Sequence, residues 1–295
     1  MDRTLATPDS QITMRIGFIG AGKVGFSMGK FFALNGLPVS GYYSRSISSA
    51  QEAATFTKSS YFASIEDLIA ASDAIFVTVP DNMIADVYGR MRRFDLAGKQ
   101  ICHCSGSLSA AEVFTDLEVD GATGYSLHPL FPVSNKYESY KELPNAVFCI
   151  EGSAEHLDDW RSLLEKLGAR VQVISGSDKK RYHAACVVAS NLVCGLAQQG
   201  IDMLVSCGFS NDGALEALTP LMRANMDHII ECGPTDALTG PVERNDTMTV
   251  AAHVKCLEDP VDRSVYKNVS LKLLDMAAKR HPHNDYAPLR EVLKD

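Results

Sequence analysis

The sequence predicts an α/β fold in which a doubly wound parallel sheet is followed by an all-helical second half. Two observations lead to this prediction. Short apolar runs alternate with helix-like segments as far as residue 174, and no further strand pattern follows Ser175-Gly176-Ser177. Strands that alternate with capped helices form βαβ units with parallel strands and right-handed crossovers. We therefore expect a flexible tail over residues 1–13, a sheet domain over 14–176 and a helical domain over 177–295.

The strands of the first half are predicted from apolar runs between turn residues. The first run ends in a glycine-rich segment, and the helix-like stretch after it, 23–35, is ended by Gly36-Leu37-Pro38. Segments with the spacing of a capping box predict further helices that begin at Ser48, Ser64 and Ser109. The predicted strands are 14–20, 39–44, 74–79, 100–104, 123–127, 146–150 and 170–174.

The second half is predicted to be helical over 178–207, 212–232, 246–258 and 261–279. The first of these helices carries small or apolar residues on nearly every face, so we expect its own domain or a partner subunit to bury it. Its apolar stretch, 184–197, is shorter than the ~20 residues that span a bilayer. A buried helix is therefore expected rather than a membrane span.

The composition is that of a soluble globular protein, and its charge limits the possible partners. Lys and Arg number 28 against 36 Asp and Glu, a net charge of −8, which argues against non-specific binding to nucleic acid or to an anionic membrane. No CxxC pair occurs among the eight cysteines and residues 1–11 contain no apolar leader, so we expect mostly buried free thiols and a cytoplasmic location. Cys102 and Cys104 share one face of a predicted strand, but two ligands do not make a zinc site, and we expect no metal.

The segment Gly20-Ala21-Gly22-Lys23-Val24-Gly25 has the form GxGxxG and lies between a predicted strand and a predicted helix. In this setting the first glycine allows a tight turn, the second lets the backbone approach a pyrophosphate, and the third lets helix and strand pack closely. The N–H groups at the start of the helix then face the phosphates. The sequence therefore predicts a dinucleotide-binding domain of the Rossmann type.

The end of the second predicted strand indicates which dinucleotide is bound. A site that prefers NAD usually carries Asp or Glu there, whereas this strand ends in Ser44-Arg45-Ser46. Hydroxyls and a guanidinium suit the 2′-phosphate of NADP(H), and a solvated polar loop is the alternative. Val79-Pro80-Asp81 ends another strand and is expected to line the path of the cofactor, to begin a helix, or to do both.

Further motifs follow along the chain: His103-Cys104-Ser105-Gly106, Leu127-His128-Pro129-Leu130, Tyr182-His183-Ala184-Ala185 with Ser190-Asn191, Leu238-Thr239-Gly240-Pro241 with Arg244-Asn245-Asp246, and Thr249-Val250 with His253. From Met14 to about Ala278, the chain resembles a family in which a Rossmann-like domain is joined to a C-terminal domain of unknown function. That family is related to the NADP-dependent oxidoreductases that include pyrroline-carboxylate reductase and the deazaflavin-dependent enzymes. The resemblance implies a helical domain that dimerises, and the family usually has glycine where this chain has Asn245.

Hydride transfer needs a group that gives or takes a proton, and two histidines are candidates for it. His183 lies one helical turn after Lys179 and, on a continuous helix, shares a face with Asn191. Such a face can protonate a substrate oxygen and hold its other polar atoms. Alternatively, His183 is a buried histidine bonded to the backbone. His128 follows a strand directly and is the second candidate, with a turn that orients the chain as the alternative.

The remaining polar motifs are assigned to the surroundings of the substrate. Ser105 and Gly106 are expected to contact the nicotinamide or the substrate, whereas His103, inside a strand, is expected to be structural. Thr239 lies in a turn that is either rigid structure or a cover for the substrate. Arg244 either binds a substrate carboxylate or pairs with Asp246 to fix that turn, in a cluster that includes His253.

These observations together predict a homodimeric NADP(H)-dependent oxidoreductase. Its substrate is expected to be a small carbonyl, imine or hydroxy compound bound between the two domains. The alternative is a dinucleotide-binding regulatory or scaffold protein without turnover, because none of the polar clusters forms a complete catalytic set.

Overall fold

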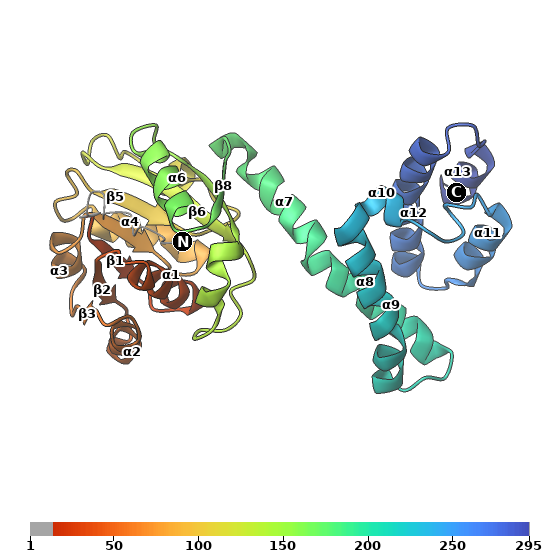
Figure 1. The fold of residues 1–295 in the computed structure, drawn as a ribbon, viewed down its shortest axis with the longest axis horizontal. Helices are drawn as coiled ribbons and strands as arrows, with labels where there is room; N and C mark the ends of the chain where they lie inside the picture. The colour runs from red at the N-terminus through yellow and green to blue at the C-terminus, as the bar shows by residue number, and fades with distance from the viewer. Residues whose placement is uncertain (1–13, 295) are drawn as a thin grey trace, which may run out of the picture. The chain divides into compact units, whose positions relative to one another are not determined.

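The computed structural model describes residues 14–294 as two compact units, with the division between Ala189 and Ser190. The predicted flexible tail, 1–13, lies outside the described residues. The predicted α/β fold is confirmed: the first unit holds a sheet of eight strands and the second is helical (Figure 1). The first unit extends past the predicted boundary at 176, because the helix that follows still packs its side chains against the sheet.

The sheet has the strand order β3-β2-β1-β4-β5-β6-β7-β8. Neighbouring strands run parallel except β6 and β7, which pair antiparallel from Leu130–Val147 to Tyr125–Gly152. The predicted parallel sheet therefore contains one antiparallel pair. The segment between the two strands contains only two short 3-10 turns, η1 (Ser139–Lys141) and η2 (Leu143–Asn145), and no crossover helix of the kind a parallel connection uses. The strands are β1 (Ile16–Ile19), β2 (Val39–Tyr43), β3 (Ser60–Tyr61), β4 (Ala74–Val77), β5 (Gln100–His103), β6 (Thr123–Leu130), β7 (Val147–Gly152) and β8 (Arg170–Val173).

Helices cover both faces of the sheet, and alternate residues of each strand divide between them. In β4, Phe76 packs in one apolar cluster with α1, α2 and α6, whereas Ile75 and Val77 pack in the other with α3, α4 and α5. The two clusters form the core of the first unit and hold the carboxyl ends of the strands at one edge. The helices are α1 (Lys23–Leu34), α2 (Ile47–Thr57), α3 (Ile65–Ala70), α4 (Asp81–Met91), α5 (Ala110–Val113) and α6 (Leu157–Lys166).

The predicted helix starts are right at two of three positions. Ser64 caps α3, and Ser109 forms a complete capping box with Glu112 at the start of α5. For α2 the prediction of Ser48 is wrong, because the cap is Ser46, whose hydroxyl accepts the Ser49 N–H at 3.3 Å. Two serines near the start of one helix can both serve as caps, and the backbone conformation decides between them.

The second unit consists of helices, and its core lies in the C-terminal part. Leu274, Leu289 and Leu293 are fully or almost fully buried there, where α11, α12 and α13 meet. The predicted helix over 178–207 is two helices, α7 (Lys179–Ala189) and α8, with a break at Ser190. Ser and Asn side chains compete for local backbone hydrogen bonds, which disfavours a helix interior at Ser190-Asn191. The helices of the second unit are α8 (Asn191–Ser206), α9 (Asn211–Cys232), α10 (Pro234–Ala237), α11 (Thr247–Cys256), α12 (Pro260–Arg280) and α13 (Ala287–Lys294).

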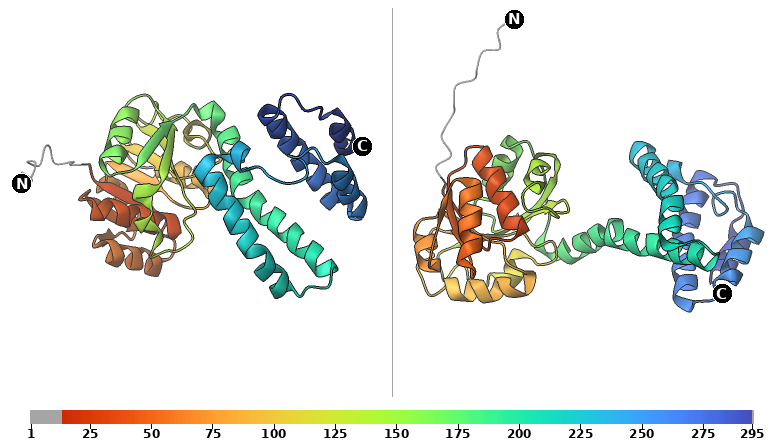
Figure 2. Two further views of the ribbon diagram at one scale, coloured as in Figure 1. Left: turned by 45° about the vertical axis from the view of Figure 1, so that its right-hand side comes forward. Right: turned by 90° about the horizontal axis from the view of Figure 1, so that it is seen from below.

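Helices α8 and α9 lie side by side (Figure 2). No residue of α8 is buried, and Ala214 is the single buried residue of α9. Of the two expected ways to cover the apolar stretch, burial by its own domain is therefore not observed, and burial by a partner subunit stays a prediction. One described segment, Gly176–Ser206, is long and apolar enough by length and composition to cross a membrane. Helices of soluble proteins pass the same test, so the finding is weak evidence for a membrane span.

The cysteines differ between the units. Only Cys102 and Cys149 of the eight cysteines are fully buried, so the expectation of mostly buried thiols is wrong. Cys104 and Cys186 are partly buried in the first unit. The exposed thiols lie in the second unit and are Cys194, Cys207, Cys232 and Cys256.

Candidate functional site

The glycine motif lies at the carboxyl end of β1, where α1 begins. Gly20 has φ +110°, in the region that favours glycine, and its carbonyl accepts the Thr78 hydroxyl at 2.9 Å. A Cβ on Gly25 would lie 2.6 Å from both the Gly20 oxygen and Thr78 Oγ1, so α1 packs against the strand as closely as glycine permits. Gly22 caps α1 without any side-chain bond and has open space where a Cβ would stand. The first turn of α1 is thus free to bind an anion through its N–H groups.

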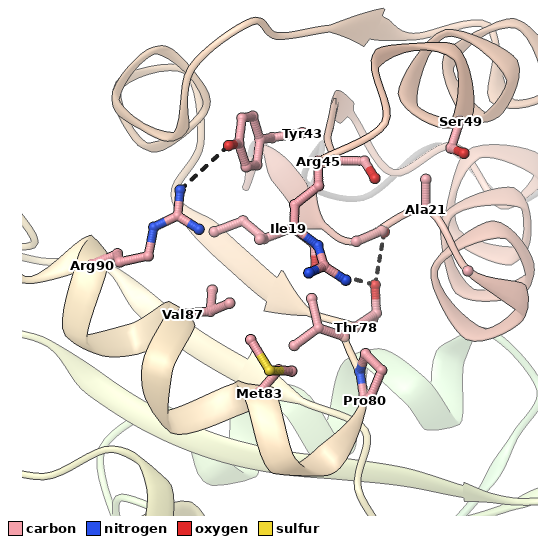
Figure 3. A pocket seen from close by; sticks show the side chains of 14 residues that line it. Ile19, Ala21, Tyr43, Arg45, Ser49, Thr78, Pro80, Met83, Val87 and Arg90 are labelled. Atoms are coloured by element: carbon pink, nitrogen blue, oxygen red, sulfur yellow. Dashed lines mark hydrogen bonds between the residues drawn. The ribbon is translucent and has the colours of Figure 1, made fainter.

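A pocket opens beside this glycine loop (Figure 3). Ser44, Arg45, Val79 and Pro80, four of the residues predicted to bind the cofactor, line it, and no carboxylate does. Ser46 and Asp81 are absent from the lining, because Ser46 caps α2 and Asp81 binds two serine hydroxyls elsewhere. The lining residues are Ile19, Gly20, Ala21, Gly22, Tyr43, Ser44, Arg45, Ser49, Thr78, Val79, Pro80, Met83, Val87 and Arg90.

The loop after β5 is organised around the hydroxyl of Ser105. That hydroxyl donates to Asp81 Oδ2 at 2.7 Å and accepts the backbone N–H groups of Ser107 and Leu108 at 3.2 and 3.1 Å. Ser107 donates a second hydroxyl to the same carboxylate oxygen at 3.0 Å. Asp81, the first residue of α4, therefore connects the segment after β4 to the loop after β5 through hydrogen bonds. These bonds fix the conformation of the loop that contains Gly106.

Two imidazoles converge on this loop. A Cβ on Gly106 would lie 2.8 Å from His183 Nδ1 and 2.9 Å from His128 Nε2. His128 belongs to β6, two residues beyond Ser126, which pairs with the last residue of β5. His183 belongs to α7, and its Nδ1 is buried without a hydrogen bond in the described part of the chain. The structure therefore brings together the two histidines and the Ser105-Gly106 segment that the sequence singled out.

A buried lysine lies beside them. Lys179 is 0% exposed, which is rare for lysine, and its Nζ donates to Ser126 Oγ at 2.6 Å. Glu151, opposite Ser126 on β7, is 4% exposed and accepts the Ala110 N–H at 2.8 Å. Burial lowers the pKa of Lys179 and raises that of Glu151, and each carries a charge that opposes the shift of the other.

His128 and Tyr182 form a hydrogen-bonded pair. Tyr182 Oη lies 2.7 Å from His128 Nδ1, with the two rings edge to face. Burial, assisted by the positive charge of Lys179, lowers the pKa of His128 to about 4, so the imidazole is neutral at pH 7. Burial and the neighbouring Cys149 and Cys186 thiols raise the pKa of Tyr182, which keeps its proton. The pair thus consists of a protonated phenol and a neutral imidazole, between which a proton can pass.

His103 differs from these two histidines. It is fully buried inside β5, and burial lowers its pKa to about 3. Its Nδ1 accepts the Ser105 N–H at 3.1 Å and so stabilises the loop after β5. This is the structural role expected from the sequence.

The other predicted residues belong to the second unit. Asn191 is the first residue of α8, after the break at Ser190, whereas His183 belongs to α7. Thr239 and Arg244 are exposed residues of the second unit. Arg244 makes no ion pair with Asp246 among residues 14–294; instead Asp246 caps α11 through the Thr249 N–H at 3.0 Å.

His253 and Asn245 also have local roles. His253 Nδ1 lies 2.8 Å from Tyr266 Oη. Asn245 has φ +57°, which explains the glycine that the family usually has there, and its amide donates to the Asp285 carbonyl at 2.8 Å. In the described chain, no group of three or more His, Cys, Asp or Glu side chains is arranged to hold a metal ion.

Sequence reasoning assigned no role to several residues of the site. Tyr182 belongs to one of the sequence motifs, but no function was assigned to it. Ser126 and Glu151 are neighbours only because of the register between β6 and β7. Arg90 could have been found from its spacing, because it lies seven residues after Met83 and therefore on the same face of α4.

Two family models match the chain: a Rossmann-like domain over residues 5–129 and the domain of unknown function DUF2520 over residues 146–273. Among solved structures, a protein from Thermotoga maritima is 26% identical with a TM-score of 0.72, over 90% of this chain and 99% of that one. A Bacteroides fragilis protein named as an NADP oxidoreductase is 21% identical, with a TM-score of 0.66, over 89% and 98% of the two chains. A reductive aminase from Aspergillus terreus, in complex with NADPH and ethyl levulinate, is 18% identical, with a TM-score of 0.61, over 95% and 99%. None of the curated proteins compared with the chain matches it.

Proposed function

We propose, because this chain joins a Rossmann-like domain to a DUF2520 domain, that it is a cytoplasmic NADP(H)-dependent oxidoreductase acting on a small carbonyl, imine or hydroxy compound. One observation carries the proposal. The glycine pocket at β1 and the polar cluster at β5 and β6 lie along the same carboxyl edge of one sheet. Ligands of doubly wound sheets bind along this edge. A dinucleotide held at the glycine loop can therefore extend toward the cluster.

The residues present fit the cofactor. Gly20 and Gly25 leave no room for a Cβ, while Gly22 leaves the start of α1 open to a pyrophosphate. Arg45 and Ser44, with no carboxylate in the pocket lining, suit the 2′-phosphate of NADP(H) rather than a free ribose hydroxyl. When bound, the nicotinamide supplies or accepts the hydride. The structural relatives named as an NADP oxidoreductase and as an NADPH-bound reductive aminase support this assignment.

The polar cluster supplies the proton that accompanies hydride transfer. Tyr182 can donate to Nδ1 of the neutral His128, which leaves the imidazole proton on Nε2, the atom that faces Gly106. His183 presents Nδ1 to the same glycine. The ammonium group of Lys179 lies near the Tyr182 ring, 5.6 Å from its centroid. Because its pKa is lowered, Lys179 releases a proton more readily than an exposed lysine does. These groups can deliver one proton to a substrate oxygen or nitrogen beside the loop.

The test is calorimetric titration of the protein with NADPH, NADP, NADH and NAD, alongside Arg45→Ala. We expect micromolar binding of the phosphorylated forms, weakened in the variant by roughly 10- to 100-fold, because a charge-assisted bidentate contact is lost. Arg93→Ala, which removes an exposed arginine outside the pocket, is the matched control and should bind as the wild type does. If none of the four nucleotides binds, the proposal is wrong. Consumption of NADPH with a panel of ketones, imines and ketone–amine mixtures then separates an enzyme from a binding protein without turnover.

We also propose that the functional form is a homodimer through the helical unit. Leu196 on α8 and Leu221 on α9 are 44% and 66% exposed, within an apolar surface that no other part of the described unit covers. Exposed apolar surfaces of this kind mark interaction sites. Light scattering should give the mass of two chains, and Leu196→Glu should give one. Met248→Glu, at an exposed position on α11, is the control. A monomeric wild type, or partition into detergent micelles, would contradict the proposal.

A further inference from the structure

The nucleotide pocket contains two guanidinium groups from different elements. Arg45 follows β2, and Arg90 lies in the last turn of α4 (Figure 3). Arg90 Nη2 donates to the Tyr43 hydroxyl over 3.4 Å, a long bond that leaves most of its donors unused. Arg90 forms no ion pair with any residue in 14–294, although α4 carries two aspartates. Among the described residues, the position of Arg90 is therefore not explained by a carboxylate partner.

The surroundings of the two arginines differ. Ser44, Arg45 and Ser49 come from the segment after β2 and all line the pocket, and serine hydroxyls are groups that bind phosphate. Arg90 shares its helix face with Met83 and Val87, which are apolar and also line the pocket. The pocket lining thus combines Arg45 and serine hydroxyls from the segment after β2 with Arg90 and apolar side chains from α4.

Tyr43 lines the pocket together with apolar residues of α4. Tyr42, before it, is fully buried and stacks on Phe18 at 5.0 Å between ring centroids, on the face of the sheet covered by α1. Alternation along β2 therefore directs Tyr43 to the opposite face, where it packs with the cluster that contains Val87. Met83, Val87 and Tyr43 form the apolar part of the pocket lining, which we call the slot. The hydrogen-bonded pair of the Tyr43 hydroxyl and the Arg90 guanidinium borders this slot. Such a slot suits a flat aromatic base rather than a phosphate.

We infer that Arg90 and Tyr43 form the subsite for the adenine ring, and that Arg90 stacks on the purine while Arg45 binds the 2′-phosphate. A guanidinium without a carboxylate partner binds well to the face of an aromatic ring. The hydroxyl of Tyr43 accepts a hydrogen bond from Arg90 Nη2, which connects the guanidinium of α4 to the last residue of β2. This inference rests on the proposed function, and it assigns the two arginines separate tasks. Arg90 determines affinity for every adenine nucleotide, and Arg45 determines the preference for NADP(H).

The experiment measures the affinity of the wild type, Arg90→Ala, Arg90→Lys and Arg45→Ala for NADPH, NADH, 5′-AMP and nicotinamide mononucleotide. Arg90→Ala should weaken NADPH, NADH and 5′-AMP by the same factor, roughly 5- to 30-fold, and leave nicotinamide mononucleotide unchanged. Arg90→Lys, which keeps the charge but not the planar group, should lose most of that affinity. Arg45→Ala should weaken NADPH alone. Fluorescence of the single tryptophan, Trp160, buried in the first unit, reports whether each variant is folded.

The possible results separate the inference from the proposed function. If Arg90→Ala weakens NADPH but leaves NADH and 5′-AMP unchanged, Arg90 binds the phosphate and the inference is wrong. If a folded Arg90→Ala binds every nucleotide as the wild type does, the inference is also wrong while the proposed function stands. If the wild type binds no dinucleotide, both fail. Equal loss for the three adenine nucleotides, with an unchanged ratio of NADPH to NADH affinity, supports the inference.

Discussion

Titration of His103 should make the first unit less stable in acid. Its ring is fully buried at the end of β5, where Nδ1 accepts the Ser105 N–H and the edge contacts Phe114, 5.3 Å away between ring centroids. A proton on Nδ1 would turn this acceptor into a donor facing another donor. The fold therefore resists protonation of the ring.

The sign and the magnitude follow from the pKa. Burial lowers the pKa of His103 from 6.5 to about 3, and Lys179 and His128 act in the same direction, whereas Asp81 and the Ser109 backbone act against it. The unfolded chain thus takes up a proton near pH 6.5 that the folded chain refuses until about pH 3. The stabilisation is present above pH 6.5 and is lost as the pH falls through this window. From pH 7 to pH 5 the loss due to His103 is about 2 kcal/mol of unfolding free energy.

The assay is urea unfolding at pH 7 and pH 5, followed by the fluorescence of Trp160, which reports on the first unit alone. His103→Asn keeps an acceptor for the Ser105 N–H but does not titrate in this range. The wild type should lose about 2 kcal/mol more than this variant between the two pH values. His283→Asn removes an exposed histidine of the second unit and should behave as the wild type does. Equal losses in wild type and His103→Asn would refute the reasoning.

Three further substitutions test separate parts of the structure. His183→Ala should abolish turnover and leave NADPH affinity unchanged, measured by NADPH consumption and calorimetry; full activity would remove His183 from the mechanism. Gly25→Ala should weaken NADPH binding by at least about 10-fold, because its Cβ would lie 2.6 Å from the Gly20 carbonyl and force the loop away from the helix; wild-type affinity would contradict this packing. Asn245→Ala should destabilise the second unit by roughly 1–2 kcal/mol, because the residue has φ +57°, whereas Asn245→Gly should cost less; circular dichroism during thermal unfolding compares the two.

Much of the fold could be predicted because its signals are local. Apolar runs and caps such as Ser109 are contained within a few residues, and the strands they predict are found within a few positions. The direction of β7 could not be predicted from its apolar run, since parallel and antiparallel strands can have the same pattern. The missing helix before β7 was the available clue. β3, two exposed residues long, has no apolar pattern at all.

The site was predictable to the extent that it is made of contiguous motifs. Gly20, Gly25 and Arg45 follow from the order of strand, loop and helix. The environment of Lys179 does not, because its burial depends on β6 and β7 meeting α7, and the sequence shows only a lysine in a polar stretch. For the same reason Tyr182 was not recognised as the partner of His128, 54 residues away along the chain.

The thiols of the two units differ in exposure and should therefore react with a modifying reagent at different rates. A water-soluble maleimide should modify the second unit first, because the exposed sulfhydryls are all there and those of the first unit are at least partly buried. Two of the exposed ones, Cys194 and Cys232, lie on the apolar pair of helices α8 and α9. Their alkylation kinetics, followed by mass spectrometry across a dilution series, would report directly whether that surface is shielded at a given protein concentration.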